Sequence, residues 1–184
     1  MTTIDDAANF SERFHLRDGS EVLMRAVRPD DLDKLVAAFH ELDPESVYTR
    51  FHSPKRELSA SDIGRFQSID FVHSIMLVLT RHVGGKEVII GGASCFFGQT
   101  PEGVAMAEVS FTVEEDYQGQ GLASRLLKVL IEMARARGTA HLEAEVLSEN
   151  SAMRKVFERS GLPLRTRRDG GEVHIEMDLK SDVG

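Results

Sequence analysis

The sequence is short of cysteine and aromatic residues and has no long hydrophobic run. Of its 184 residues one is cysteine (Cys95), two are tyrosine and none is tryptophan. A single cysteine excludes an intramolecular disulfide, which favours a reducing, cytoplasmic setting. Every apolar run is far shorter than the roughly 20 residues that span a bilayer, and the first residues lack the basic-then-apolar pattern of a signal peptide. The sequence therefore predicts a cytoplasmic protein with no membrane segment, in which Cys95 is a buried structural thiol.

A net positive charge is also missing. The chain has 30 acidic residues against 22 lysines and arginines, a formal net charge of −8. Because nucleic-acid phosphates are usually bound by a net basic face, this balance argues against nucleic acid as the main partner. The seven histidines are scattered, without the spacing to cysteines or carboxylates that metal ligands have, so no metal site is predicted. The rest of the composition is ordinary for a soluble globular domain.

The pattern of elements predicts one mixed α/β domain. Residues 1–12 are expected to form a flexible tail and residues 13–181 a single domain. Periodicity and turn signals predict strands at 14–16, 22–27, 74–81, 87–97, 104–113, 141–147, 164–168 and 172–179, and helices that begin near residues 29, 44 and 59 and cover 122–137 and 150–160. The strand-helix-strand order over 104–147 implies a right-handed crossover and a locally parallel pair.

The segment that joins strand 104–113 to the next helix carries the clearest functional signal. Residues 118–123 read QGQGLA. A helix start presents unpaired backbone N–H groups and the positive end of a dipole, and glycines let the backbone approach a bulky anion. A pyrophosphate is the natural ligand for such a turn. The spacing matches neither the three-glycine dinucleotide pattern nor a P-loop, and on glycine spacing alone a plain tight turn explains it equally well.

Gln118, Gly121 and Ala123 match Gln-x-x-Gly-x-Ala, the coenzyme A loop of the GNAT N-acetyltransferases, so the chain resembles that superfamily. The order of elements agrees over roughly residues 20–180, and Asn150 opens a helix after a strand, as in the family. The resemblance implies the GNAT fold, with a central, mostly antiparallel twisted sheet, one splayed parallel pair, and helices on both faces. It also implies acetyl-CoA as cosubstrate.

Upstream motifs are similar to the acetyltransferase domains of bacterial Pat-like protein-lysine acetyltransferases. They are residues 16–19, residues 25–31 and the motif Tyr48-x-Arg50-Phe51. This narrower resemblance implies direct transfer of the acetyl group to a primary amine in a ternary complex, in particular to a protein lysine. It leaves the choice between monomer and homodimer open.

The resemblance also assigns roles to particular residues. The backbone of Phe111 and Val113 would pair with the pantetheine arm. Asn150 would contact the same arm, or alternatively would only cap its helix. The residues expected to hold the pyrophosphate, chiefly through backbone N–H groups, are Gln118, Gly119, Gln120, Gly121, Leu122, Ala123 and Ser124.

Glu108 is the expected general base. A lysine amine has a pKa of about 10.4, so only roughly one in two thousand is neutral at pH 7, and a carboxylate that accepts its proton assists attack. Along its strand, Glu108 shares a face with Met106, Ser110 and Thr112. The Pat-like enzymes that this chain resembles use a glutamate in the matching Ala-Glu-x-x-x-x-Val segment. The alternative is a glutamate on a partly wet strand face.

Phe157 departs from the family pattern. Many members place a tyrosine seven residues after the helix-opening asparagine, as general acid for the leaving thiolate, and here that position is Phe157. The two tyrosines, Tyr48 and Tyr117, do not match it, so no general acid is predicted. The departure keeps another class of function open, a non-catalytic acyl-CoA-binding module. A third possibility is a small-molecule amine as acceptor. The size of the acceptor cleft, set by residues 44–73 and the terminal hairpin, would distinguish it from a protein acceptor.

Overall fold

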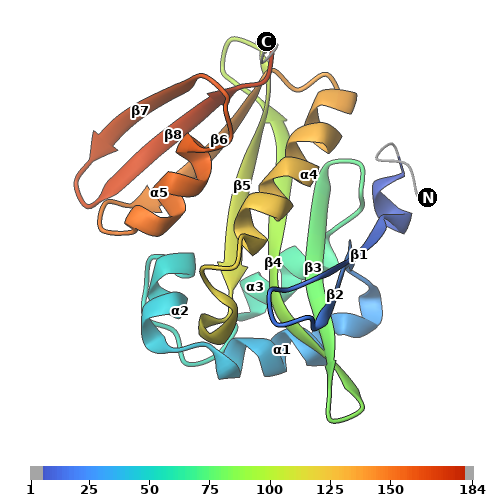
Figure 1. Ribbon diagram of the computed structural model, residues 1–184. Helices are drawn as coiled ribbons and strands as arrows, with labels where there is room; N and C mark the ends of the chain where they lie inside the picture. Colours follow the sequence, from blue (N-terminus) through green and yellow to red (C-terminus); the bar gives the residue numbers. More distant parts are fainter. Residues whose placement is uncertain (1–5, 181–184) are drawn as a thin grey trace.

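The computed structural model describes residues 6–180, which form an open eight-stranded sheet with helices on both faces (Figure 1). The strands are β1 (Ser11–His15), β2 (Glu21–Ala26), β3 (Ser74–Val83), β4 (Lys86–Gln99), β5 (Ala105–Val113), β6 (His141–Leu147), β7 (Leu164–Asp169) and β8 (Glu172–Asp178). They lie in the order β1-β2-β3-β4-β5-β6-β8-β7, and only β5 and β6 are parallel. The predicted mixed fold with one parallel pair is confirmed.

Five α-helices accompany the sheet in this part of the chain. They are α1 (Leu32–Glu41), α2 (Pro44–Phe51), α3 (Ala60–Gln67), α4 (Leu122–Ala136) and α5 (Ser151–Glu158). Two of the starts follow directly from sequence. The Asp43 carboxylate accepts a hydrogen bond from the N–H of Ser46 at the start of α2, and Ser59 and Asp62 form a reciprocal capping box at the start of α3. These caps satisfy N–H groups that a helix leaves unpaired at its start.

The two faces of the sheet carry separate hydrophobic clusters. In β3, Leu77 and Leu79 belong to the larger cluster, which includes the apolar side of α4. Val78, between them, belongs to a smaller cluster with Leu35 of α1 and Phe66 of α3. Because successive strand residues point to opposite faces, α4 covers one face and α1 with α3 the other. Each fully buried large aliphatic side chain contributes roughly 1.5–3 kcal/mol to the folded state.

The longest helix, α4, has the apolar stripe that its sequence predicts. Leu122, Leu126, Val129, Leu130 and Met133 are all buried. The helix crosses the sheet next to β4 and β5 and fills the centre of the larger cluster (Figure 1). Within residues 6–180, none of the helices has the length and apolar character needed to cross a membrane.

A buried ionic network fastens α1 to the sheet. Arg25 of β2 makes two hydrogen bonds to Asp31, of 2.7 and 2.8 Å, and both side chains are at most 1% exposed. Glu87 of β4 pairs with Arg25 and, at 2.6 Å, with Lys34 of α1. Burial alone would raise the pKa of Asp31, but hydrogen bonds from Arg25 and from the N–H of Arg28 outweigh it and lower this pKa to about 2. The network therefore holds ionised carboxylates inside the fold.

The expected tail at residues 1–12 is wrong over its second half. Residues 7–9 form a short 3-10 helix, and β1 begins at Ser11 and pairs with β2. Ala7 and Phe10 are only 2% and 6% exposed and belong to the larger cluster. Two apolar anchors therefore order a stretch whose composition is otherwise polar. Residues 1–5 and 181–184 lie outside the described part.

Cys95 is fully buried on β4, as its sequence context predicts. Burial raises the pKa of its thiol to about 12. The reactive thiolate is therefore negligible at neutral pH, and Cys95 is a packing residue.

Candidate active site

Strand β5 is paired along one edge and mostly unpaired along the other. Its register with β4 runs through nine residue pairs, from Ala105 to Val113. Its register with β6 contains three pairs and ends at Glu108. Beyond Glu108 the two parallel strands separate, so the last five residues of β5 have a free edge. This is the splayed pair that the resemblance predicts.

The backbone of Phe111 and Val113 faces the gap between the separated strands. Glu114 donates its N–H to the carbonyl of Ile90 in β4, at 3.0 Å. In an antiparallel pair these bonds alternate, so Phe111 and Val113 direct their N–H and C=O groups away from β4. The carbonyl of Val113 accepts a hydrogen bond from Nε2 of Gln118 at 3.0 Å. The loop glutamine therefore folds back onto the strand edge.

The loop before α4 ends in a helix start without a side-chain cap. Gly121 is the N-cap, and Gly119 and Gly121 have φ values of 71° and 80°. Such left-handed backbone costs other residues about 1–2 kcal/mol, so glycine is favoured here. The first bond within the helix runs from the N–H of Arg125 to the carbonyl of Gly121. The N–H groups of residues 122–124 therefore lack partners within the helix, and the first turn contains no acidic residue.

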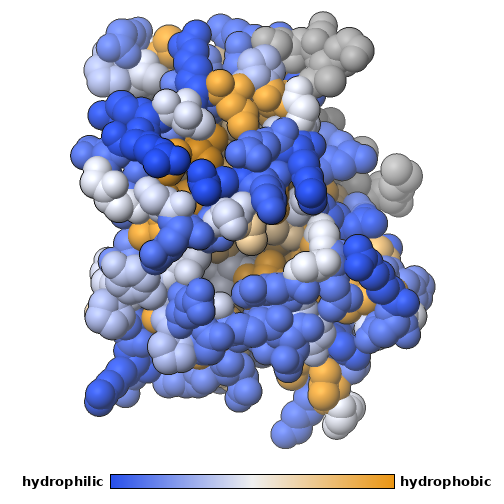
Figure 2. All heavy atoms as spheres, turned by 60° about the vertical axis from the view of Figure 1, so that its left-hand side comes forward, coloured by the Kyte–Doolittle hydropathy of each residue, from blue (hydrophilic) through white to orange (hydrophobic). Residues whose placement is uncertain are grey.

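A cleft of about 760 Å³ opens in front of this helix start and the free edge of β5. It is bounded by α2 on one side and by the start of α5 on the other. Figure 2 brings the side with α2 and α5 forward and shows a recess with hydrophobic atoms at its floor and hydrophilic atoms around it. The predicted cofactor residues that line the cleft are Phe111, Val113, Gln118, Gly119, Gly121, Leu122, Ala123, Ser124 and Asn150. Gln120 is the one predicted cofactor residue that does not line it.

Asn150 lies at the start of α5, where it caps the helix; its contact with the cofactor arm stays a prediction. Its Oδ1 accepts a hydrogen bond from the N–H of Met153 at 3.1 Å, which caps the helix. The residue also lines the cleft, where Lys155 of α5 and Arg159, the C-cap of that helix, add positive charge one turn apart. Arg159 had no sequence signal beyond its spacing from Lys155. Together these side chains form a polar wall opposite the free edge of β5.

Phe157 is a core residue. It is 1% exposed and packs edge-on against Phe111, with ring centroids 5.9 Å apart. The tyrosines that line the cleft come from other elements, Tyr48 from α2 and Tyr117 from the loop before α4. The Tyr117 hydroxyl accepts a hydrogen bond from Arg81 at 3.3 Å. The aromatic position that many relatives use for chemistry is therefore used here for packing.

Glu108 lies where β5 and β6 begin to separate. It is exposed and sits opposite Phe96 on β4 and Glu143 on β6. It shares a strand face with Ser110 and interacts favourably with the charge of Arg50. An exposed carboxylate at the end of the parallel pair can accept a proton from an amine that approaches from solvent.

Helix α2 is held across the end of β5 by contacts at both of its ends. Before its first residue, the N–H of Asp43 donates to the Glu115 carboxylate at 3.2 Å. Behind its last residue, His52 contacts the Glu172 carboxylate of β8 through Nδ1. The segment from residue 44 and the terminal hairpin are thus joined at the side of the cleft, and α2 presents Tyr48 and Arg50 toward β5.

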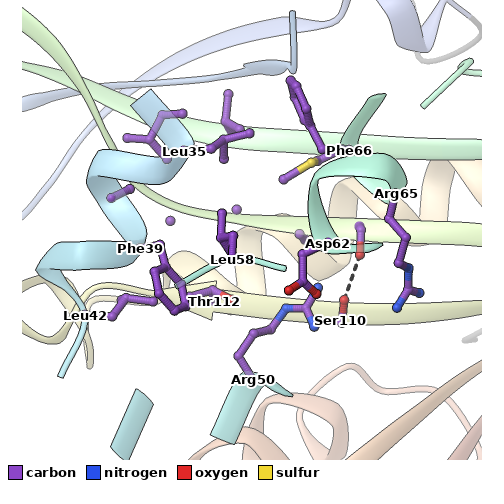
Figure 3. A pocket seen from close by; sticks show the side chains of 18 of the residues that line it. Leu35, Phe39, Leu42, Arg50, Leu58, Asp62, Arg65, Phe66, Ser110 and Thr112 are labelled. Atoms are coloured by element: carbon purple, nitrogen blue, oxygen red, sulfur yellow. Dashed lines mark hydrogen bonds between the residues drawn. The ribbon is translucent and has the colours of Figure 1, made fainter. Parts of the chain in front are cut away.

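A second, smaller hollow of about 180 Å³ lies under α1 and α3, on the face of the sheet opposite α4 (Figure 3). Its walls are mainly apolar, with Leu35, Phe39, Leu42, Leu58 and Phe66 among them. Polar groups gather at one end, where Arg50, Asp62, Arg65 and Ser110 lie near one another (Figure 3). Arg50 and Thr112 line both this cavity and the cleft, so the two hollows adjoin.

Arg50 is a polar residue of the cavity for which the sequence predicted no role. Its guanidinium lies over the ring of Phe51, 5.0 Å from the centroid. Burial lowers the pKa of Arg50, and the neighbouring charge of Arg65 lowers it further, while Asp62 and Glu108 act in the opposite sense. Among residues 6–180 it has neither a hydrogen bond nor an ion pair. A half-buried cation without a hydrogen-bonded or ion-paired partner among the described residues therefore lines both hollows.

The acetyltransferase (GNAT) domain family matches residues 21–163 of this chain. That is well over half of its length, so the chain belongs to the GNAT acetyltransferase family. The resemblance noted in the sequence is confirmed at the level of the family and the fold.

Three known proteins illustrate the likeness. The chain is 33% identical over 164 residues to the acetyltransferase Pat of Mycolicibacterium smegmatis, which covers 89% of this chain and 47% of that protein. It therefore spans about half the length of that relative. The crystal structure of the GNAT domain of S. lividans PAT matches with a TM-score of 0.79 and 34% identity, over 91% of this chain and 96% of that one.

A more distant structure is yncA, a putative acetyltransferase from Salmonella typhimurium solved with its cofactor acetyl-CoA. Its TM-score is 0.67 at 19% identity, over 89% of this chain and 96% of that one. At this identity the likeness shows the fold alone. The names of the nearer relatives support an N-acetyltransferase.

Proposed function

We propose that this chain transfers the acetyl group of acetyl-CoA directly to a primary amine, in a ternary complex and without an acyl-enzyme. The observation that carries the proposal is the free edge of β5, which leads into an uncapped helix start at a cleft of about 760 Å³. A strand edge and a helix start offer backbone donors for amides and phosphates, the two kinds of group that coenzyme A presents along its length.

The residues of the cleft suit each part of the cosubstrate. The backbone of Phe111 and Val113 would bind the pantetheine amides, with Asn150 beside them. The N–H groups of residues 118–124 would bind the pyrophosphate, and Lys155 and Arg159 lie near enough to the cleft to neutralise phosphate charge. The acetyl-CoA in the Salmonella typhimurium relative supports this choice of ligand.

Glu108 is proposed to accept the proton of the attacking amine. Acetyl-CoA, when bound, supplies an activated thioester. The amine nitrogen forms a bond to the acetyl carbon as the carbon–sulfur bond breaks, and its proton passes to Glu108 directly or through water. The departing sulfur takes a proton from water, because Phe157 has none to give. The exposed position of Glu108 supports exchange of its proton with solvent.

A protein lysine is the acceptor that the resemblance to Pat-like enzymes implies. The exposure of Glu108 supports it, since a side chain carried on another protein can reach an exposed strand face. A cytoplasmic location and a monomeric or homodimeric state remain predictions.

The proposal can be tested with the whole chain in two measurements. A thermal-shift titration should show stabilisation by acetyl-CoA, because a ligand that binds only the folded state must stabilise it. Release of free CoA thiol should then be followed with lysine-containing peptides and small amines. Stabilisation without CoA release from any amine would instead support a non-catalytic acyl-CoA-binding module, and absence of both would refute the proposal.

A further inference from the structure

The cavity under α1 and α3 adjoins the proposed transfer site. Arg50 and Thr112 line both the cavity and the cleft. Ser110, next to Glu108 on the same strand face, lines the cavity as well. A ligand in the cavity would therefore end beside the carboxylate proposed as the base.

The size and lining of the cavity suit a compact apolar group. Its volume is about 180 Å³, and an apolar cavity of roughly 150 Å³ binds benzene. Leu35, Phe39 and Phe66 line its inner part (Figure 3). A branched aliphatic or phenyl side chain would fill it. The opposite end is polar, so the complete ligand must be amphipathic.

The polar end carries charges of both signs. Arg50 and Arg65 face it, and Arg50 is without an ion pair among the described residues. Asp62 is already bonded through Oδ2 to Lys55, at 2.6 Å, and to Ser59. Its charge is therefore partly matched, whereas the two guanidinium groups repel each other. An anionic group between Arg50 and Arg65 would relieve that repulsion, and Glu108 nearby suits an amine.

We propose that the cavity binds a free α-amino acid with an apolar side chain as a further class of acceptor. The carboxylate lies at Arg50 and Arg65, the amino group is directed toward Glu108, and the side chain fills the cavity. An α-amino acid fits because its amine and carboxylate share one carbon atom, so both reach the polar end while the side chain points inward. The acetylation step rests on the proposed function.

The reaction on this acceptor is the same as on any primary amine. The amino acid first loses one proton from its ammonium group to solvent. Its nitrogen then forms the amide bond to the acetyl carbon, the carbon–sulfur bond breaks, and the second proton passes to Glu108. The products are an N-acetyl amino acid and CoA, whose sulfur takes up one proton.

The test compares amino acids with the same molecules lacking the carboxylate. L-phenylalanine and L-leucine are measured against 2-phenylethylamine and isoamylamine, both for binding by calorimetry in the presence of CoA and for CoA release from acetyl-CoA. The amino acids should bind and react at least tenfold better. Equal binding of phenylalanine and phenylethylamine would overturn the proposal, and so would failure of both to bind.

Two variants localise the effect. Arg65→Gln should reduce phenylalanine binding about tenfold, while Arg56→Gln, an exposed arginine in the preceding loop that does not line the cavity, should not. Ala38→Leu adds volume to the α1 wall and should shift the preference from phenylalanine toward alanine. If both arginine variants behave alike and Ala38→Leu leaves the preference unchanged, the amino acid does not bind here.

The outcomes also separate this inference from the proposed function. Turnover of lysine peptides with neither binding nor acetylation of amino acids would refute the inference alone. Binding of phenylalanine without any CoA release would support the site and refute the enzyme. An affinity that rises from acetyl-CoA to hexanoyl-CoA and is lost in Ala38→Leu would show that the cavity takes the acyl chain of the donor, which overturns the inference.

Discussion

The cleft along β5 and the cavity under α1 and α3 meet at Arg50 and Thr112, but different kinds of chemical group line them. The cleft offers backbone N–H and C=O groups, mostly from the continuous stretch 111–124. The cavity offers side chains from helices α1 and α3 and from the middle of the sheet. Backbone recognition tolerates changes of side chain, whereas a wall of side chains changes with each substitution. Under the proposed function, cosubstrate binding is therefore a property of the fold, while acceptor choice is particular to this chain.

The largest expected effect comes from the ionic network that fastens α1, one wall of the cavity, to the sheet. Asp31→Asn removes a charge that is 0% exposed and paired with Arg25. Removing one partner of a buried ion pair costs about 3–5 kcal/mol. Because Glu87 still pairs with Arg25, urea unfolding should show a loss near the lower end of that range. Asp33→Asn, an exposed α1 carboxylate, is the matched control and should cost less than about 0.5 kcal/mol. A loss below about 1 kcal/mol in Asp31→Asn would show that the network is dispensable.

The next effect concerns the proposed base on β5, two residues before Ser110 of the cavity wall. Glu108→Gln keeps the size of the side chain but removes the base, so turnover should fall about 10²-fold or more at neutral pH. The affinity for acetyl-CoA should hardly change, because Glu108 does not line the cleft. Glu102→Gln, in the exposed turn before β5, should be fully active. Steady-state CoA release and calorimetry would check this, and full activity of Glu108→Gln would remove it as the base.

Acid should lower the stability of the fold by protonating the carboxylates of the same ionic network. The pKa values of Asp31 and Glu87 are lowered to about 2 in the folded protein, from 3.8 and 4.5. A carboxyl group whose pKa is lower in the folded than in the unfolded protein stabilises the fold at pH values above its unfolded pKa. This contribution is lost as the pH falls from about 4.5 toward 2. On the order of 2 kcal/mol per carboxylate should disappear in that window. Melting temperatures measured against pH should fall less steeply below pH 4.5 in Asp31→Asn than in the unchanged protein. Equal slopes in the two proteins would contradict the assignment of the acid loss to this network.

The smallest expected effect isolates the backbone of the cleft. Gly121→Ala forces a side chain into φ near 80° and should cost about 1–2 kcal/mol of stability. Because the strain disturbs the helix start, affinity for CoA should fall roughly tenfold. Gly103→Ala is matched, with φ near 81° in a turn remote from the cleft lining, and should destabilise equally while binding CoA normally. Equal CoA affinity in the two variants would argue against the uncapped helix start as the phosphate site.

The two hollows also differ in how far sequence could predict them. The loop 118–124 is continuous, and its glycines and its place between a strand and a helix are local properties, so all but Gln120 of its predicted residues lie at the cleft. The Ser59–Asp62 capping box was readable for the same reason. The family resemblance supplied Phe111 and Val113, and the strand pairing then showed that they face the gap.

The cavity could not be predicted, because it depends on packing between distant segments. Arg50 stood in a recognised motif, but its exposure to both hollows follows from how α2 is fastened across β5. Arg159 lacked a motif, and Ala7 and Phe10 were hidden in a polar stretch because two apolar residues give no periodic signal. Local sequence patterns do not predict side-chain environments that arise from packing between distant segments.

The floor of the cavity has a consequence for how this protein can change. Gly92 of β4 faces it, and a methyl group added there would meet the carbonyl oxygen of Leu77 at 2.6 Å. The neighbouring strand therefore enforces glycine, whatever the ligand. The helical roof, formed by α1 and α3, is not constrained in this way, and residues such as Ala38 and Phe66 are positions at which substitutions could reshape the cavity without touching the sheet.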